Sequence, residues 1–236
     1  MCSRYFLDAD GNIIAYTFRV PVTGDVRKRY NIAPTQVAPV VRLARADETP
    51  GGTERPRELA MLRWGLVPSW AKDISVGNQM INARAETVAE KPAFRKALEK
   101  RRCIVPATGF YEWQGAPGQK QPFAITFPEA PVFGFAGLWE RWRPEAGDPV
   151  DTFTIVTTDA NETVGSIHDR MPVILSPEQA DTWLSSDVAG ARALLEPFKG
   201  ETKMRAVTRR MSNPRAEGPE CLDDAEPTWG SQSKLF

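Results

Sequence analysis

The residue with the richest potential chemistry is Cys2, which becomes the N-terminus if Met1 is removed. We expect this removal because the side chain of Cys is small. An N-terminal Cys carries an amine with a pKa of about 8 beside a thiol with a pKa of about 8.5. The amine can condense with an aldehyde to an imine, and the thiol can then close a thiazolidine ring intramolecularly. The competing interpretation is an inert chain terminus.

His168 is the only histidine of the chain and is followed by Asp169 and Arg170 in a predicted loop. A histidine there could exchange a proton near neutral pH. Alternatively, His168 could be a structural residue whose hydrogen bonds are satisfied within the fold.

Two further segments carry polar groups suited to a reaction site. Glu112 lies among aromatic residues of a predicted strand, so its carboxylate either points outward by alternation or is buried with a raised pKa. Asn82 and Arg84 are two positions apart and share one face if the chain is extended there. The alternative for this pair is the start of a helix with ordinary polar residues.

Composition limits the class of protein. The chain has 236 residues and a formal net charge of zero, which argues against a polycation that coats DNA. Arg outnumbers Lys, which fits either a local phosphate-binding face or a GC-rich genome. The three cysteines, Cys2, Cys103 and Cys221, form no CxxC pair, and with one histidine they predict neither a disulfide framework nor a metal site.

These features predict a protein of a reducing compartment, hence a cytoplasmic one. We find no signal peptide and no run long enough to cross a membrane. We expect a monomer without a cofactor or metal, and we assign no role to Cys103 or Cys221.

The hydrophobic pattern predicts a single α+β domain, mainly antiparallel β and barrel-like, with peripheral helices. A hairpin is expected around residues 115–120, and an exposed loop over residues 45–57. Helices are expected over residues 91–102 and 189–197, and from an N-cap at Ser176 through Trp183. Strands are expected at residues 37–43, 59–64, 103–106, 122–127, 132–139, 153–158 and 173–175.

Six segments, in order and spacing, resemble the SOS-response-associated peptidase family, called SRAP. They lie at residues 1–5, 29–34, 64–70, 81–86, 109–113 and 167–172. The resemblance ends near residue 213, so we assign residues 1–214 to an SRAP domain and residues 215–236 to an irregular tail. Many family members have Gly where this chain has Ser3.

The resemblance implies a protein that senses and shields abasic sites by forming a thiazolidine crosslink. Cys2 would be the nucleophile, Asn82 would position its amine or the opened sugar, Glu112 would transfer protons and His168 would assist ring opening. The partner would be single-stranded DNA, or a junction of single- and double-stranded DNA, that contains the lesion. Phosphates would be bound by Arg4, Arg84, Arg170 and, on weaker grounds, Thr157. The strand path would be shaped by Asn31, Pro34, Trp70 and Trp113.

Two other functions stay open from the sequence. Cys2 could serve an N-terminal-nucleophile peptidase or amidohydrolase, although no Gly-rich segment clearly supplies an oxyanion hole. The protein could also be a non-catalytic reader of modified DNA, in which Cys2 is incidental.

Overall fold

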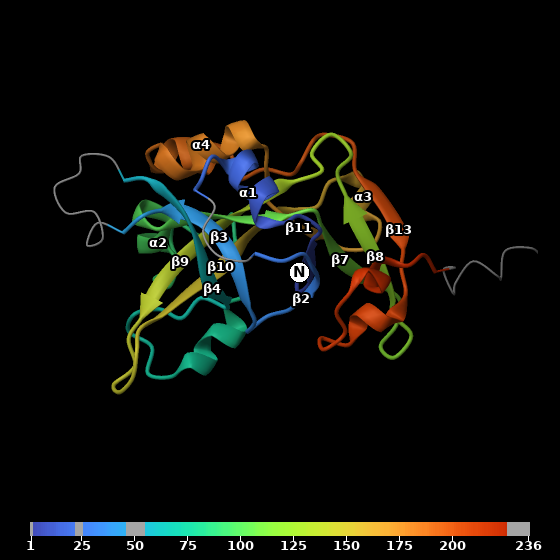
Figure 1. The fold of residues 1–236 in the computed structure, drawn as a ribbon, viewed down its shortest axis with the longest axis horizontal. Coiled ribbons are helices and arrows are strands. Elements are labelled where there is room, and N and C mark those ends of the chain that lie inside the picture. The colour runs from blue at the N-terminus through green and yellow to red at the C-terminus, as the bar shows by residue number, and fades with distance from the viewer. Residues whose placement is uncertain (1, 22–25, 46–54, 226–236) are drawn as a thin grey trace, which may run out of the picture.

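A closed barrel of five strands is the larger of the two β-structures of the protein (Figure 1). The computed structural model describes residues 2–21, 26–45 and 55–225. Each strand pairs with two barrel neighbours, and only the pair of β4 and β10 is parallel. In order around the barrel the strands are β3 (Val37–Leu43), β4 (Arg57–Trp64), β10 (Val150–Asp159), β9 (Phe133–Trp142) and β6 (Arg102–Ala107).

Strands β6 and β9 are buried on both faces, apart from the partly exposed Arg141. Helices α2 (Arg95–Lys100) and α4 (Pro177–Ser185) pack against them. The indole nitrogen of Trp183 in α4 donates to the carbonyl oxygen of Cys103 at 2.8 Å. Because neither face meets water, these strands are nearly continuous apolar runs in the sequence.

A smaller antiparallel sheet lies beside the barrel and has its own core. That core contains Phe6, Tyr111, Val207, Met211 and Cys221. The β7–β8 pair forms the expected hairpin. In order across the sheet the strands are β13 (Lys203–Ala206), β8 (Gln121–Thr126), β7 (Gly109–Gln114), β1 (Tyr5–Leu7) and β2 (Arg29–Ile32).

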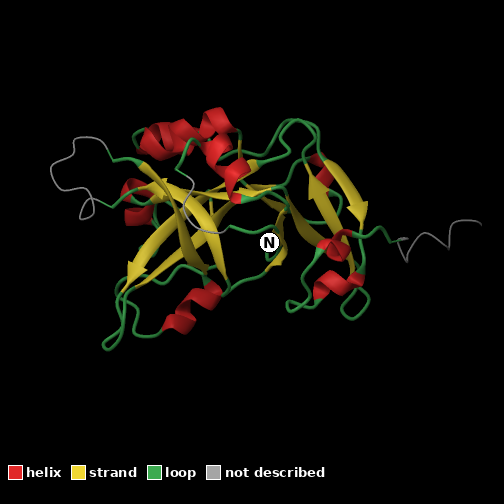
Figure 2. Cartoon of the chain, viewed as in Figure 1, coloured by secondary structure: helices red, strands yellow, loops and turns green. Residues whose placement is uncertain are grey.

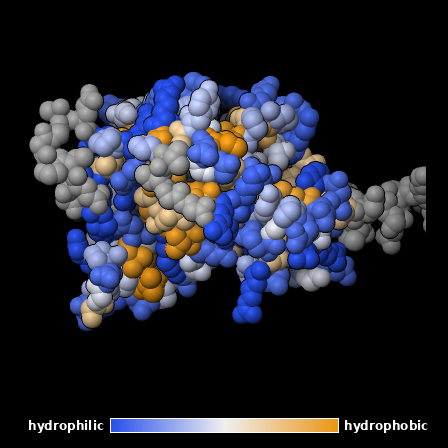
Figure 3. All heavy atoms as spheres, in the orientation of Figure 1, coloured by the Kyte–Doolittle hydropathy of each residue, from blue (hydrophilic) through white to orange (hydrophobic). Residues whose placement is uncertain are grey.

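The helices lie at the periphery of the strands (Figure 2). Ser176 caps α4 in a reciprocal capping box with Gln179, as its sequence predicts. No helix of the described residues is long and apolar enough to cross a membrane. The face seen in Figure 3 is mostly hydrophilic, with a few apolar patches. The other helices are α1 (Gly11–Phe18), α3 (Glu162–Gly165), α5 (Val188–Ala193), η2 (Ile74–Gln79), η3 (Arg209–Ser212) and η4 (Pro219–Leu222).

Three short strands attach to the barrel, and two of them, β5 and β11, carry polar side chains. Strand β5 (Asn82–Arg84) runs parallel to β10, and β11 (Arg170–Pro172) pairs with the same strand. Strand β12 (Ile174–Leu175) pairs with β9. Consequently β10 brings Asn82 and Arg170 to the same region, although they are far apart in the sequence.

The predicted fold class is confirmed: an α+β, mainly antiparallel, barrel-like structure with peripheral helices. The helix expected over residues 91–102 was too long, since only Arg95–Lys100 is α-helical and turns precede it. Helix α1 was not expected, because its Ile, Tyr, Thr and Phe residues favour strands.

Two predicted segments are only partly described by the structure. Of the loop expected over residues 45–57, residues 46–54 lie outside the described part, and β4 begins at Arg57. Residues 215–225 of the expected irregular tail pack on the smaller sheet through η4 and the buried Cys221. The domain boundary at residue 214 stays a prediction.

Candidate active site

Ser3 and Arg4 separate Cys2 from β1, and the N-terminal end of the chain lies between the barrel and the smaller sheet (Figure 1). The Cys2 side chain is fully buried. The side-chain amide nitrogen of Asn82, in β5, donates to the Cys2 carbonyl oxygen at 2.7 Å. The other amide atom, Asn82 Oδ1, is buried and accepts no hydrogen bond within the described residues. Asn82 therefore holds the backbone of Cys2 and keeps one acceptor available beside it.

The Cys2 thiol is in an environment that disfavours its thiolate. Burial, and next the negative charge of Glu112, raise the pKa of the Cys2 thiol far above its usual range. A protonated thiol is a poor first nucleophile. This order of reactivity suits an amine that attacks first and a thiol that adds second.

Glu112 is buried in β7 rather than turned to solvent, with only 3% of its surface exposed. Burial raises the pKa of Glu112 to about 7. A carboxyl group with this pKa exchanges protons readily at neutral pH. Of the two sequence interpretations, the structure therefore supports the buried carboxyl group.

His168 lies between α3 and β11. Its Nδ1 accepts a hydrogen bond from the backbone N–H of Arg170 at 2.9 Å and is 3.1 Å from Asp169 Oδ1. The Asp169 carboxylate favours the charged ring, but burial outweighs it and lowers the pKa of His168. The ring is thus neutral at pH 7, with Nδ1 as acceptor and the proton on Nε2.

Lys120 connects Glu112 and His168 electrostatically. Burial dominates both pKa shifts; the positive charge of Lys120 offsets a small part of the rise in the pKa of Glu112 and adds slightly to the fall in the pKa of His168. The hairpin also approaches the His168 loop through a 3.5 Å hydrogen bond from Gln114 Nε2 to the carbonyl oxygen of Ser166.

The predicted DNA contacts differ widely in exposure. Trp70 is 63% exposed, and Arg84 is exposed in a pocket that it shares with Asn82 and Lys91. Pro34 is half-buried in the turn after β2. These positions are compatible with DNA binding, which stays a prediction.

Arg170 is engaged by the protein itself. Its guanidinium group forms a bidentate pair with Glu86 at 2.8 and 2.9 Å and a contact with Asp159 at 2.6 Å. It also donates to the carbonyl oxygen of Thr157 at 2.9 Å. Two carboxylates already surround this cation, so its predicted role as a phosphate ligand would require it to share or exchange partners.

Asn31 and Thr157 are fully buried, which speaks against a direct contact of either side chain with DNA. Thr157 Oγ1 donates to the carbonyl oxygen of Ala83 at 3.4 Å and so ties β10 to β5. Asn31 Oδ1 accepts from Arg4 Nη1 at 2.9 Å. Its amide nitrogen contacts the carbonyl oxygens of Met211, Asn213 and Ala216. Both residues therefore position backbone segments around the site.

Replacing Asn31 by Ala should lower the free energy of unfolding by roughly 3 kcal/mol, because several buried hydrogen bonds lose their partner. Urea unfolding measures this change, and Asn12→Ala, at an exposed position of α1, is the control. Unchanged stability together with weaker DNA binding would instead indicate a direct DNA contact of Asn31.

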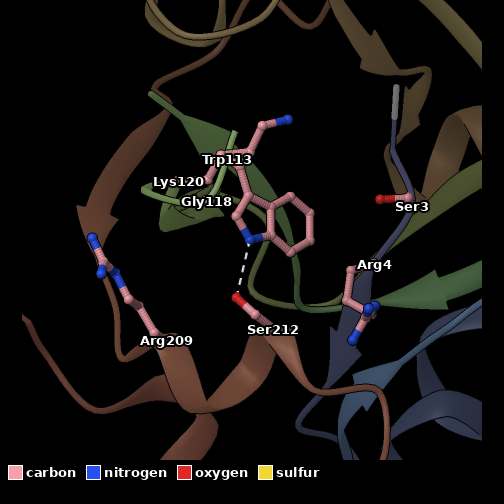
Figure 4. A pocket seen from close by; sticks show the side chains of 7 residues that line it. All are labelled: Ser3, Arg4, Trp113, Gly118, Lys120, Arg209 and Ser212. Atoms are coloured by element: carbon pink, nitrogen blue, oxygen red, sulfur yellow. Dashed lines mark hydrogen bonds between the residues drawn. The ribbon is translucent and has the colours of Figure 1, made fainter. Parts of the chain in front are cut away.

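Sequence reasoning missed three polar residues near the site, namely Lys120, Arg209 and Ser212. Together with Arg4 and Trp113 they line a pocket that also includes Ser3, the chain neighbour of Cys2 (Figure 4). Only the consecutive arginines at 209 and 210 hinted at a basic surface, and nothing linked them to Glu112. Within the described residues, no group of three or more His, Cys, Asp or Glu side chains could hold a metal ion.

Comparison with known proteins places the chain in a family. A family model described as SOS response associated peptidase (SRAP) matches residues 1–214. The chain belongs to the SRAP family. The chain is also similar to a crystal structure of a protein from Bacteroides thetaiotaomicron, with a TM-score of 0.81 and 28% identity over 95% of this chain and 100% of that one.

Two SRAP relatives carry functional names. The abasic site processing protein YoqW of Bacillus subtilis is 39% identical over 232 residues, which cover 94% of this chain and 99% of YoqW. The abasic site processing protein HMCES of Gallus gallus is 33% identical over 225 residues, 84% of this chain and 67% of HMCES.

Proposed function

We propose that this SRAP protein processes abasic sites in DNA by linking Cys2 covalently to the opened deoxyribose. One observation carries the proposal: Cys2 is held by Asn82 next to a buried carboxyl group, Glu112, whose pKa is about 7. The names of the relatives support an abasic site as the substrate.

The proposed reaction proceeds in three steps, and water is its only by-product. The closed sugar opens when a proton reaches the ring oxygen and the C1′ hydroxyl loses one, a transfer assisted by His168. The Cys2 amine then adds to C1′, and Glu112 protonates the departing hydroxyl as the imine forms. Finally the Cys2 sulfur bonds to C1′ while the thiol proton moves to the imine nitrogen, which closes the thiazolidine.

Single-stranded DNA, or a junction with duplex DNA, suits this chemistry best, because the sugar must reach a buried residue. Exposed cations such as Arg84 supply phosphate contacts. Binding to undamaged strands should therefore be weaker and should decline as salt rises.

Intact-mass analysis tests the proposal. The purified protein should lack Met1, and mixing with an abasic single strand should add the mass of the DNA less one water. An undamaged strand of the same sequence is the control. Retention of Met1 in an active preparation would overturn the mechanism, and turnover of amide substrates without an adduct would identify a hydrolase.

Replacing His168 by Asn should slow adduct formation with the cyclic abasic sugar by about 10²-fold, as expected for loss of one proton-transfer group. A strand that carries a non-cyclising aldehyde at the same position should react at the wild-type rate. Quenched time courses on denaturing gels compare the two substrates. Equal slowing on both would place the action of His168 after ring opening.

A further inference from the structure

Three strand ends meet at a cluster of charged side chains that the proposed reaction does not use. Arg170, the first residue of β11, lies between Glu86, in the turns that follow β5, and Asp159, the last residue of β10. The Arg170 side chain is only 11% exposed, whereas those of Glu86 and Asp159 are 48% and 79% exposed. The protein therefore encloses the cation and leaves both carboxylates at the surface.

Glu86 is the partner that fixes the orientation of the Arg170 guanidinium group. Its two carboxylate oxygens accept from Nη1 and Nη2 at 2.8 and 2.9 Å, in the bidentate geometry that aligns both planar groups. Asp159 accepts through one oxygen, from Nη1 at 2.6 Å. The hydrogen bond from Arg170 lowers the pKa of Glu86, so this carboxylate is charged at neutral pH. The two-point contact of Glu86 therefore restrains the cation more than the single contact of Asp159.

Arg170 in turn contacts the residue that assists ring opening in the proposed reaction. Its backbone N–H donates to His168 Nδ1 at 2.9 Å. A donor at Nδ1 keeps the ring proton on Nε2 and restrains the plane of the imidazole. The Glu86 carboxylate therefore holds, through the side chain of Arg170, the residue whose backbone sets the His168 tautomer.

The same cluster is connected to the strand that holds the proposed nucleophile. Strand β5 begins at Asn82, which binds the backbone of that nucleophile. Just after β5, the backbone N–H of Ala85 donates to the carbonyl oxygen of Thr157 at 2.8 Å. Arg170 Nη2 donates to the same oxygen at 2.9 Å. The pair of Glu86 and Arg170 thus links the strand that holds the nucleophile to the loop that holds the histidine.

We propose that Glu86 is a positioning residue for the reaction: through Arg170 it orients the His168 ring toward the sugar that the N-terminal amine attacks. The inference rests on the proposed function, which gave Glu86 no part. A contact of Glu86 with the phosphates of DNA is disfavoured, because both groups are negatively charged. An ion pair that only stabilises the fold would leave the His168 ring unaffected, and this difference can be measured.

Replacing Glu86 by Gln keeps the size of the side chain but removes its charge and one of its two acceptor oxygens. Adduct formation with the cyclic abasic sugar should slow about tenfold, less than the roughly 10²-fold that a misplacement of about 1 Å can cost. Glu162→Gln makes the same change at an exposed position of α3, in the helix that precedes His168, and should react at the wild-type rate.

The double variant Glu86→Gln/His168→Asn separates a shared action from two independent ones. If Glu86 acts through the His168 ring, its replacement has nothing left to disturb once the ring is gone. The double variant should therefore react no more slowly than His168→Asn alone. Single-turnover time courses on denaturing gels give the four rates. A double variant in which the two effects multiply would overturn the inference.

Nuclear magnetic resonance observes the ring directly, because His168 is the only histidine of the chain. With isotope-labelled histidine, the wild type and Glu162→Gln should show one tautomer, with the proton on Nε2, whereas Glu86→Gln should show a mixture of both. Asp159→Asn leaves the bidentate pair intact and should change the ring signals less than Glu86→Gln. Unchanged signals in Glu86→Gln, or a larger change in Asp159→Asn, would contradict the assignment of Glu86.

These signals require neither DNA nor an adduct, so the inference and the proposed function can fail separately. A changed ring in Glu86→Gln, with no adduct from the wild type, would refute the proposed function and leave the coupling of Glu86 to His168 in place. Fluorescence anisotropy with Cys2→Ala as background measures non-covalent binding of the abasic strand. Because Glu86→Gln removes a negative charge, this affinity should not fall. A lower affinity would assign Glu86 to DNA binding and exclude the positioning role.

Discussion

Replacing Cys2 by Ala should eliminate the denaturation-resistant adduct with abasic DNA. The variant keeps the N-terminal amine and a small second residue, so Met1 is still removed, but it has no sulfur to close the ring. What remains is an imine, which water hydrolyses. Denaturing gels should show no band for Cys2→Ala without a reductant and a band when borohydride reduces the imine.

Two controls sharpen this result. Cys2→Ser preserves the size of the side chain but carries a much weaker nucleophile, and it should behave like Cys2→Ala. Cys221→Ala removes a buried cysteine of the smaller sheet and should leave the adduct unchanged. An undiminished adduct in Cys2→Ala would exclude Cys2 as the linking residue.

Replacing Glu112 by Gln should slow adduct formation at pH 7 by about 10²-fold or more, because it removes the proton donor for loss of water. The wild-type rate should depend on a group with a pKa of about 7 and fall as that group loses its proton. The variant should lack this limb of the pH profile. Single-turnover rates from pH 5 to 9 measure both effects, and a limb that persists in Glu112→Gln would assign it to another group.

The same substitution should stabilise the protein at high pH. Burial raises the pKa of Glu112 from 4.5 to about 7, so between these values the folded protein holds a proton that the unfolded chain has lost. Stability from this group is therefore fully present below pH 4.5 and declines as pH rises to 7, by about 3 kcal/mol. Gln does not titrate, so the advantage of Glu112→Gln in urea unfolding should grow over this interval. A constant difference would contradict the raised pKa.

Local patterns predicted the fold well where the chain is strongly apolar. The runs that became β6 and β9 are buried on both faces, and the N-cap at Ser176 starts α4 as its residues indicate. The pattern failed for α1, because its residues favour strands and only the cap at Asp10 indicates a helix. Whether such a segment becomes a helix or a strand depends on its packing in the folded protein, which a short stretch of sequence does not reveal.

The site was predicted in part. That Asn82 contacts Cys2 depends on a parallel pairing of β5 with β10, and three residues of strand give little signal for such a register. For the same reason the sequence could not show that Arg170 meets Glu86. Lys120 and Arg209 come from a hairpin and a late segment, and only the assembled sheet places them beside Trp113.

The anchoring of Arg4 has a consequence for biosynthesis. Arg4 donates to the carbonyl oxygen of Met211, a residue that the ribosome adds 207 positions later. Throughout that interval the contacts that position the N-terminal segment next to Cys2 are incomplete. If Cys2 is the linking residue proposed above, we expect it to react with abasic DNA only after the segment around Met211 has docked on Arg4.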